Sequence, residues 1–287
     1  MAIGQLLGTR TITRRITAVS PGVYRASVDL PGMTAVVSPS ILSFTKAGET
    51  KTFTVKLTQD TATSNQPTTG WLTWSGAGKS VRSPIVVTPT STLAPTEVKG
   101  SGAAGSISYT ATSGFAGSPL GAYGVVSAPA VPGEVVAGAP DAELPDYPVT
   151  ATRDTKAIQW HVKTKDPNGS IWMVLYKVVD GRILLQSFQG DGSNQATASV
   201  AAPTPGVWGV LTITLSNPPG ADTTEYDIQT NVVSSTDRGG LQVTPATAPV
   251  ANAPYQVTAS WSGLDPAKHY TGYVEYPNGV GTVVAIN

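Results

Sequence analysis

Two histidines, His161 and His269, are the only imidazole bases in this 287-residue chain, which has no cysteine. A serine hydroxyl becomes a strong nucleophile only when a base takes its proton and an acidic residue orients that base. A triad built from either histidine and one of the many serines stays open. We favour ordinary histidines on a strand surface or in a loop, and predict no catalytic residue.

The oxygen donors around Asp191 suggest one metal site. Asp191 lies between two glycines and is followed by Ser193 and Asn194, and it could hold calcium together with Asp180 or Asp166. Calcium takes about six to eight oxygen ligands, however, and one carboxylate per loop falls short. We therefore expect no cofactor, with Asp180 and Asp191 as the candidates if calcium binds.

Paired carboxylates, as in glycosidases, would have to come from Asp141, Glu143 and Asp146. These residues lie in a stretch without hydrophobic periodicity, where clustered acidic residues are usually solvated. No zinc site is expected either, because two isolated histidines offer no ligand pair at short spacing.

The aromatic residues are candidates for binding, since exposed Trp and Tyr are favoured contact residues. We expect five of the six tryptophans in strand cores, namely Trp71, Trp74, Trp160, Trp208 and Trp261. The candidates for a binding surface are Trp172, Tyr270, Tyr273 and Tyr276. Tyr270 and Tyr276 are an even number of residues apart, which would place both on one face of a strand.

The amino-acid composition favours one fold class and argues against some classes of binding partner. Only 13% of the residues are charged, the formal net charge is zero, and 30 Gly and 23 Pro favour short strands joined by turns. Without a basic block, nucleic acid and anionic membrane surfaces are poor partners. The most apolar stretch, 171–185, is interrupted by charges and does not predict a membrane span. We expect an all-β monomer.

The first third of the chain predicts one sandwich. Residues 52–58 alternate strictly and place Phe53, Val55 and Leu57 on one buried face. About seven strands in roughly ninety residues match the size of a fibronectin-type sandwich. We assign this domain to residues 1–92 and expect a linker at 89–102.

The rest of the chain predicts a second sandwich with an inserted block. Residues 93–148 hold a linker and two strands, and 129–148 lacks a pattern. A strand-rich block follows at 149–235, with Asp180-Gly181 as a hairpin turn. The tail, 236–287, has a hairpin turn at Pro277 to Gly279, and we expect it to pair with 105–128.

Five segments in order resemble the fibronectin type III-like domain that follows the catalytic domain in subtilisin-like serine proteases (subtilases). They are Gly8 to Val19, Tyr24 to Val28, Val37 to Phe44, Gly48 to Val55 and Val81 to Ile85.

The later residues resemble other parts of bacterial subtilases. Leu175-Tyr176 before the Asp-Gly turn and Pro205-Gly206-Val207-Trp208 are similar to the pre-peptidase C-terminal domain, a jelly-roll-like sandwich. Some members bind calcium through acidic residues ahead of the Leu-Tyr pair, where this chain has Ile171 to Val174. The segments 259–264 and 270–276 resemble the final sandwich strands.

This resemblance implies tandem β-sandwiches, one fibronectin III/Ig-like and one jelly-roll-like, in a non-catalytic accessory region of a secreted serine endopeptidase. The chain contains neither a His-Gly-Thr segment nor a Gly-Thr-Ser-Met-Ala serine loop. The implied partner is a preceding subtilase catalytic domain, together with a protein or polysaccharide substrate. The implied location is extracellular or at the cell surface, with the export signal outside this sequence.

Two alternatives stay open. A free-standing adhesin or carbohydrate-binding β-sandwich module would present an exposed aromatic row to a polymer. An independent hydrolase would show turnover by the isolated chain.

Overall fold

The computed structural model describes residues 1–114, 116–117, 119–139, 144–245 and 248–287. Almost all regular structure is β-strand, which confirms the all-β prediction. Within the described residues, no helix has the length and apolar character needed to cross a bilayer. The chain forms two compact units, of which unit 1 comprises Met1–Leu93, Thr112–Gly117 and Pro249–Pro254, and unit 2 comprises the remainder.

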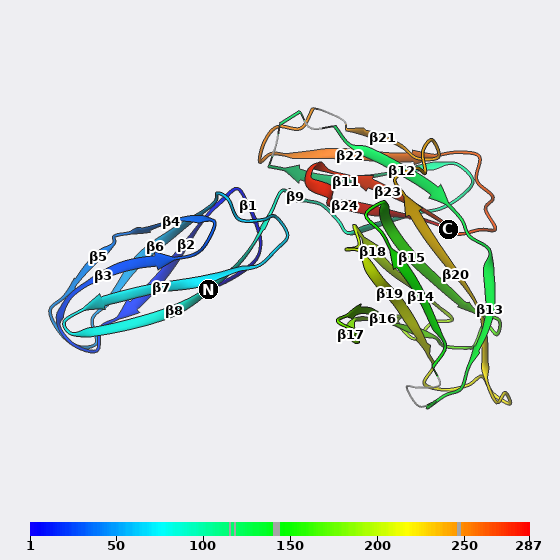
Figure 1. Ribbon diagram of the computed structural model, residues 1–287, viewed down its shortest axis with the longest axis horizontal. Coiled ribbons are helices and arrows are strands. Elements are labelled where there is room, and N and C mark those ends of the chain that lie inside the picture. The colour runs from blue at the N-terminus through cyan, green and yellow to red at the C-terminus, as the bar shows by residue number, and fades with distance from the viewer. Residues whose placement is uncertain (115, 118, 140–143, 246–247) are drawn as a thin grey trace. The chain divides into compact units, whose positions relative to one another are not determined.

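Unit 1 is a sandwich of two sheets with the strand orders β1-β8-β7-β3-β5 and β2-β6-β4 (Figure 1). Its strands are β1 (Ala2–Leu7), β2 (Thr9–Thr17), β3 (Gly22–Asp29), β4 (Met33–Ser38), β5 (Ile41–Phe44), β6 (Thr50–Gln59), β7 (Thr68–Gly76), β8 (Lys79–Thr90) and β9 (Thr92–Leu93).

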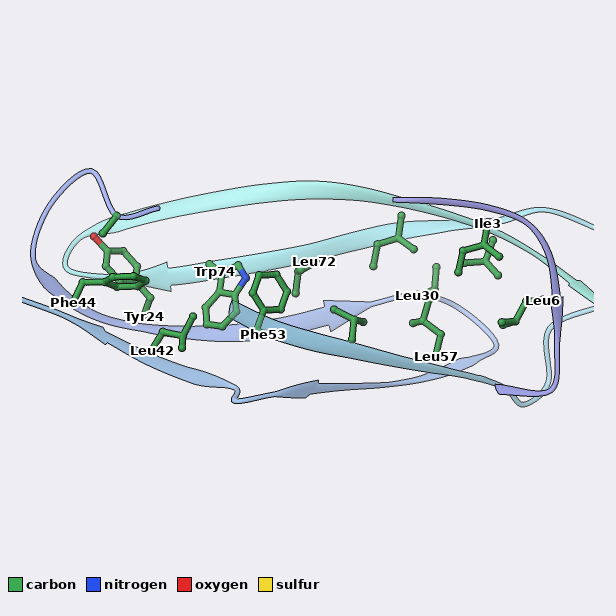
Figure 2. Packing of buried hydrophobic residues seen from close by; sticks show 14 residues of the cluster. Ile3, Leu6, Tyr24, Leu30, Leu42, Phe44, Phe53, Leu57, Leu72 and Trp74 are labelled. Atoms are coloured by element: carbon green, nitrogen blue, oxygen red, sulfur yellow. The ribbon is translucent and has the colours of Figure 1, made fainter. Parts of the chain in front are cut away.

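The core of unit 1 lies between these sheets. The predicted inward residues Phe53, Val55 and Leu57 of β6 are buried, as the alternation requires. Figure 2 shows the ring of Phe53 beside that of Trp74, with ring centroids 5.1 Å apart in an edge-on arrangement. Aromatic pairs favour this geometry because the positive ring edge meets the negative ring face.

Trp71 corrects one sequence prediction, because it is 39% exposed rather than part of the core. Trp74 and Leu72 on the same strand are buried. Trp71 and Trp74 are three residues apart, and residues an odd number apart on a strand face opposite sides, so β7 cannot turn both indoles inward.

Unit 2 holds the other strands. They are β10 (Glu97–Gly100), β11 (Gly105–Ser113), β12 (Gly121–Val126), β13 (Ala130–Val135), β14 (Asp146–Ala151), β15 (Thr155–Thr164), β16 (Trp172–Val179), β17 (Arg182–Gln189), β18 (Gln195–Ala201), β19 (Gly206–Ile213), β20 (Thr224–Ser234), β21 (Gln242–Pro245), β22 (Pro254–Trp261), β23 (Tyr270–Glu275), the short 3-10 turn η2 (Pro277–Gly279) and β24 (Gly281–Ile286). The ends of β11 and β22 fall within unit 1.

The strands that lie early and late in unit 2 share sheets. β12 pairs antiparallel with β23, with Tyr123 opposite Tyr273. β11 is the neighbour of β22 in a second sheet. Between them in sequence, β13 to β20 form two further sheets, β13-β20-β15-β18 and β14-β19-β16-β17, shown in green to yellow in Figure 1. Trp160 and Met173 are fully buried in the core of this block.

Two segments predicted to lack strands contain them. The stretch 129–148 includes all of β13 and the start of β14, and each is the end strand of its sheet. These two strands were not predicted because they contain Pro132 and Pro148. Proline has no N–H group for the hydrogen-bond ladder, so within sheets it is confined to edges. The predicted linker 89–102 likewise contains the end of β8, all of β9 and β10.

Within unit 2 the β13 to β20 block packs directly on the sheet that contains β23. Tyr123 and Tyr273 of that sheet contact Ala157 and Val233 of the block in one small buried cluster. An ion pair lies beside it, with Lys156 Nζ 2.6 Å from Glu275 Oε1. The sheet is therefore covered on both faces, because Val274, the neighbour of Tyr273, belongs to a different buried cluster.

Candidate binding surface and the histidine pair

The two histidines meet in unit 2. The rings of His161, on β15, and His269, just before β23, stack with centroids 3.6 Å apart. Nδ1 of His161 lies 3.1 Å from Thr197 Oγ1, and Nδ1 of His269 lies 2.9 Å from Asn287 Oδ1. These partners are neither serine nor carboxylate, so the arrangement differs from a hydrolase triad.

The environment of His161 opposes a positive charge. Burial lowers its pKa to about 3, and the neighbouring His269, Lys163 and Lys99 add to the effect. Its Nε2 is buried and has no hydrogen-bond partner among the described residues. This environment favours the neutral form of the His161 imidazole at physiological pH.

The calcium candidates lie too far apart to share an ion. Asp180 occupies the turn before β17, and Asp191 lies in the loop after it. The eight residues of β17 span roughly 25 Å at about 3.3 Å per residue. Asp191 instead accepts a hydrogen bond from the backbone N–H of Ser193, and hydrogen bonding by Ser193 lowers the pKa of that carboxyl group. Asp180 and Asp191 therefore cannot bind one ion together, and the pairing of Asp191 with Asp166 stays a prediction.

The structure describes one of the three carboxylates considered for a glycosidase pair. Asp141 and Glu143 lie outside the described residues. Asp146 Oδ1 accepts a hydrogen bond of 2.6 Å from the hydroxyl group of Tyr176. In the part of the chain that the structure describes, no three His, Asp or Glu side chains gather closely enough to bind a metal.

Tyr273 and Tyr276 are not surface aromatics, which corrects the sequence prediction. Tyr273 is fully buried because β23 is covered on both faces. Tyr276 is also buried, and its hydroxyl group donates to that of Tyr109 at 2.8 Å; burial raises its pKa. An even spacing predicts a shared face but not whether water reaches that face. Tyr270 is half-buried, so no row of exposed tyrosines forms.

Trp172, the remaining candidate, lies at the edge of an exposed apolar surface. Its ring centroid is 6.5 Å from that of Phe188 on the adjacent strand. Phe188 is 57% exposed, Ile183 is 56% exposed and Leu185 is 66% exposed. We call these four residues, together with Leu184, the β17 surface.

Of the β17 surface, only Trp172 was predicted from the sequence, although the sequence of β17 contains a signal for the rest. The run Ile183-Leu184-Leu185 does not alternate, and consecutive residues of a strand point to opposite faces. A strand with apolar residues on both faces is either covered on both faces or has one apolar face exposed to solvent. The Asp180-Gly181 turn was predicted correctly: Val179 pairs with Arg182, and both turn residues have positive φ, 51° and 72°.

Comparisons with known proteins place this geometry in context. Residues 1–87 match the family model described as Fibronectin type-III domain. The CO(2)-response secreted protease of Arabidopsis thaliana is 44% identical over 84 residues, which are 28% of this chain and 11% of that protein. The Subtilisin-like protease SBT4.14 of the same plant is 42% identical over 82 residues, 27% of this chain and 11% of that protein. The chain thus spans about 11% of the length of these relatives.

Similarity to solved structures is weaker. The secreted serine protease VesC from Vibrio cholerae aligns with 81% of this chain and 48% of its own, at 8% identity and a TM-score of 0.27. A TM-score this low supports no conclusion about fold or function. The first 87 residues are therefore similar to fibronectin type-III domains, and the relatives that share sequence with the chain are subtilisin-like proteases.

Proposed function

We propose that this chain is a non-catalytic accessory region of a secreted subtilisin-like serine endopeptidase. The observation that carries the proposal is the match of residues 1–87 to a fibronectin type-III model, together with 37–44% identity to subtilisin-like proteases. One relative is described as a secreted protease, which supports an extracellular or cell-surface location.

In this proposal residues 1–92 are a fibronectin III-like module. Residues 93–148 and 236–287 contribute the strands of a second sandwich, and residues 149–235 form a jelly-roll-like block inserted into it. The pairing of β12 with β23 and the adjacency of β11 and β22 support this division. The bacterial origin of the parent protein and the likeness of the block to pre-peptidase C-terminal domains belong to the proposal as well.

Unit 1 carries a surface suited to contact with a catalytic domain. Trp71 projects from β7 with the guanidinium carbon of Arg82 4.4 Å from its ring centroid. Pro84 lies directly opposite Trp71 in the register, and both are exposed. An exposed Trp with an Arg beside it is a combination enriched where proteins bind one another. We propose that this face contacts the catalytic domain.

The non-catalytic part of the proposal is tested on the isolated chain. The purified protein is incubated with casein, with peptide and glycoside substrates, and with a fluorophosphonate that labels activated serines. We expect neither turnover nor labelling, since His161 and His269 bond to Thr197 and Asn287. Turnover that disappears in the variant His269→Gln would show that the chain is itself a hydrolase.

A further inference from the structure

Strand β17 is an edge of its sheet. In the order β14-β19-β16-β17 it pairs with β16 on one side, and no other described strand pairs with it. No described strand fills its outer side, and an edge strand presents an unfilled half-ladder of backbone N–H and C=O groups to another extended chain. The carbonyl oxygen of Leu184 accepts a hydrogen bond from Gln186 Nε2 of the same strand at 3.0 Å, which an incoming strand would compete with.

The side chains of β17 do not protect this edge. Exposed edges are usually protected by lysine, proline or inward-pointing charges. The eight residues of β17 include one charge, Arg182, and no proline. Ile183 and Leu185 point to the outer face with Phe188, as their pairing with Val178, Tyr176 and Val174 shows. Leu184, 46% exposed, points to the opposite face. A strand added at this edge would find apolar contacts on both faces.

The backbone donors and acceptors of the β17 edge favour one class of ligand, an extended polypeptide. A sugar polymer can stack on Trp172, and a lipid can cover leucines, but neither uses a row of backbone donors and acceptors. An extended polypeptide satisfies these groups and places alternate side chains on the two faces. Charge adds a second criterion. Lys177 is bonded to Thr204 and Asp180 lies in the turn, so Arg182 is the charge that β17 itself offers. The complementary peptide therefore has one carboxylate among apolar residues.

We propose that β17 binds an extended segment of a substrate protein as an additional strand, with apolar side chains over Leu185 and Phe188 and an acidic residue near Arg182. This inference rests on the proposed function, since a protease accessory region encounters unfolded polypeptide. The site would hold such a chain near the protease without cleaving it.

The proposal is tested with the fluorescent peptide Val-Thr-Val-Glu-Val-Thr-Val, blocked at both ends, by anisotropy on the isolated full chain. We expect saturable binding that weakens at least tenfold in Leu185→Lys, because a lysine there protects the edge. The matched control is Val36→Lys, which alters an exposed valine of β4, an edge strand of unit 1, and should leave binding unchanged. A second probe, with N-methyl groups on alternate residues, should not bind because it lacks ladder donors.

Three results would overturn the proposal: no binding by the unaltered chain, equal binding by Leu185→Lys and the unaltered chain, or equal binding of the N-methylated peptide. Sedimentation tests a different occupant, a second copy of the chain. Dimerisation that is lost in Leu185→Lys would assign β17 to that second copy. These results concern the isolated chain, so failure here is distinguishable from failure of the accessory role, which is tested on the joined protease.

Discussion

His161 illustrates how the fold acts on a single titratable group. The side chain is 7% exposed, and its stacking on His269 places a second imidazole where a proton would otherwise be solvated. In the unfolded chain the same histidine has a pKa of about 6.5. The difference between the two states makes the stability of unit 2 depend on pH.

The sign follows from proton binding. Between pH 6.5 and the folded pKa of about 3, the unfolded chain binds the proton of His161 and the folded chain does not, so stability falls as the pH falls. From pH 7 to pH 5 the loss is about 2 kcal/mol. The variant His161→Gln, followed by urea unfolding at both pH values, should lose this part of the pH dependence. Equal pH dependence in the two proteins would contradict the assignment.

Thr271 tests the polar contacts between the inserted block and its supporting sheet. It is fully buried, donates to Gln159 Oε1 at 2.7 Å, and accepts from Asn231 Nδ2 at 3.0 Å. Thr271→Val removes these bonds, and the free energy of unfolding should fall by about 1–3 kcal/mol. Thr150→Val, at an exposed position of β14, is the control and should change it by less than about 0.5 kcal/mol. If both variants unfold alike in urea, these contacts do not stabilise unit 2.

Single residues also mark where sequence analysis reached its limit. The absence of a catalytic motif around His161 and His269 is a prediction from residue types, and it stays a prediction. Exposure was not predictable, because Tyr273 is covered by Ala157 and Val233 of the inserted block, and Tyr276 packs with Tyr109, which is far from it in sequence. Trp71 was predicted to be buried and is exposed, because Trp74 on the same strand occupies the inward-facing position.

Among the elements, the hairpin of β16 and β17 depends on its turn. Gly181 has φ 72°, and a Cβ added there would meet nothing within 4 Å. The cost of Gly181→Val is therefore conformational, at about 1–2 kcal/mol for a left-handed backbone. Asp180→Asn is the control, because asparagine tolerates positive φ. Urea unfolding should separate the two variants, and equal stability would mean that the turn adopts another geometry in solution.

Strands with a regular pattern were predictable, whereas edge strands were not. Residues 52–58 alternate because β6 has a single buried face, and the strand is found where predicted. β13 and β14 contain prolines and lie at edges, so their pattern resembles that of a loop. The β17 surface escaped notice for a related reason, since its apolar residues match a buried strand.

At the scale of the whole molecule, the fold class was predictable from glycine, proline and the short apolar runs, and it is confirmed. The division into a module, a second sandwich and an inserted block stays a prediction, supported by the register of β12 with β23. The proposed accessory role concerns a protease catalytic domain that this fold does not contain among its described residues, so the fold alone does not test it.

The accessory role is tested most directly by joining the chain to the subtilisin-like catalytic domain that the proposal expects to precede it. That protease is then compared with the same protease lacking these residues. Thermal inactivation of casein hydrolysis is the measurement, with the single variant Trp71→Ala as a third sample. We expect deletion to lower the temperature of half-inactivation and Trp71→Ala to reproduce part of that loss. Identical inactivation of all three proteins, or an upstream coding sequence without a subtilisin-like domain, would contradict the accessory role.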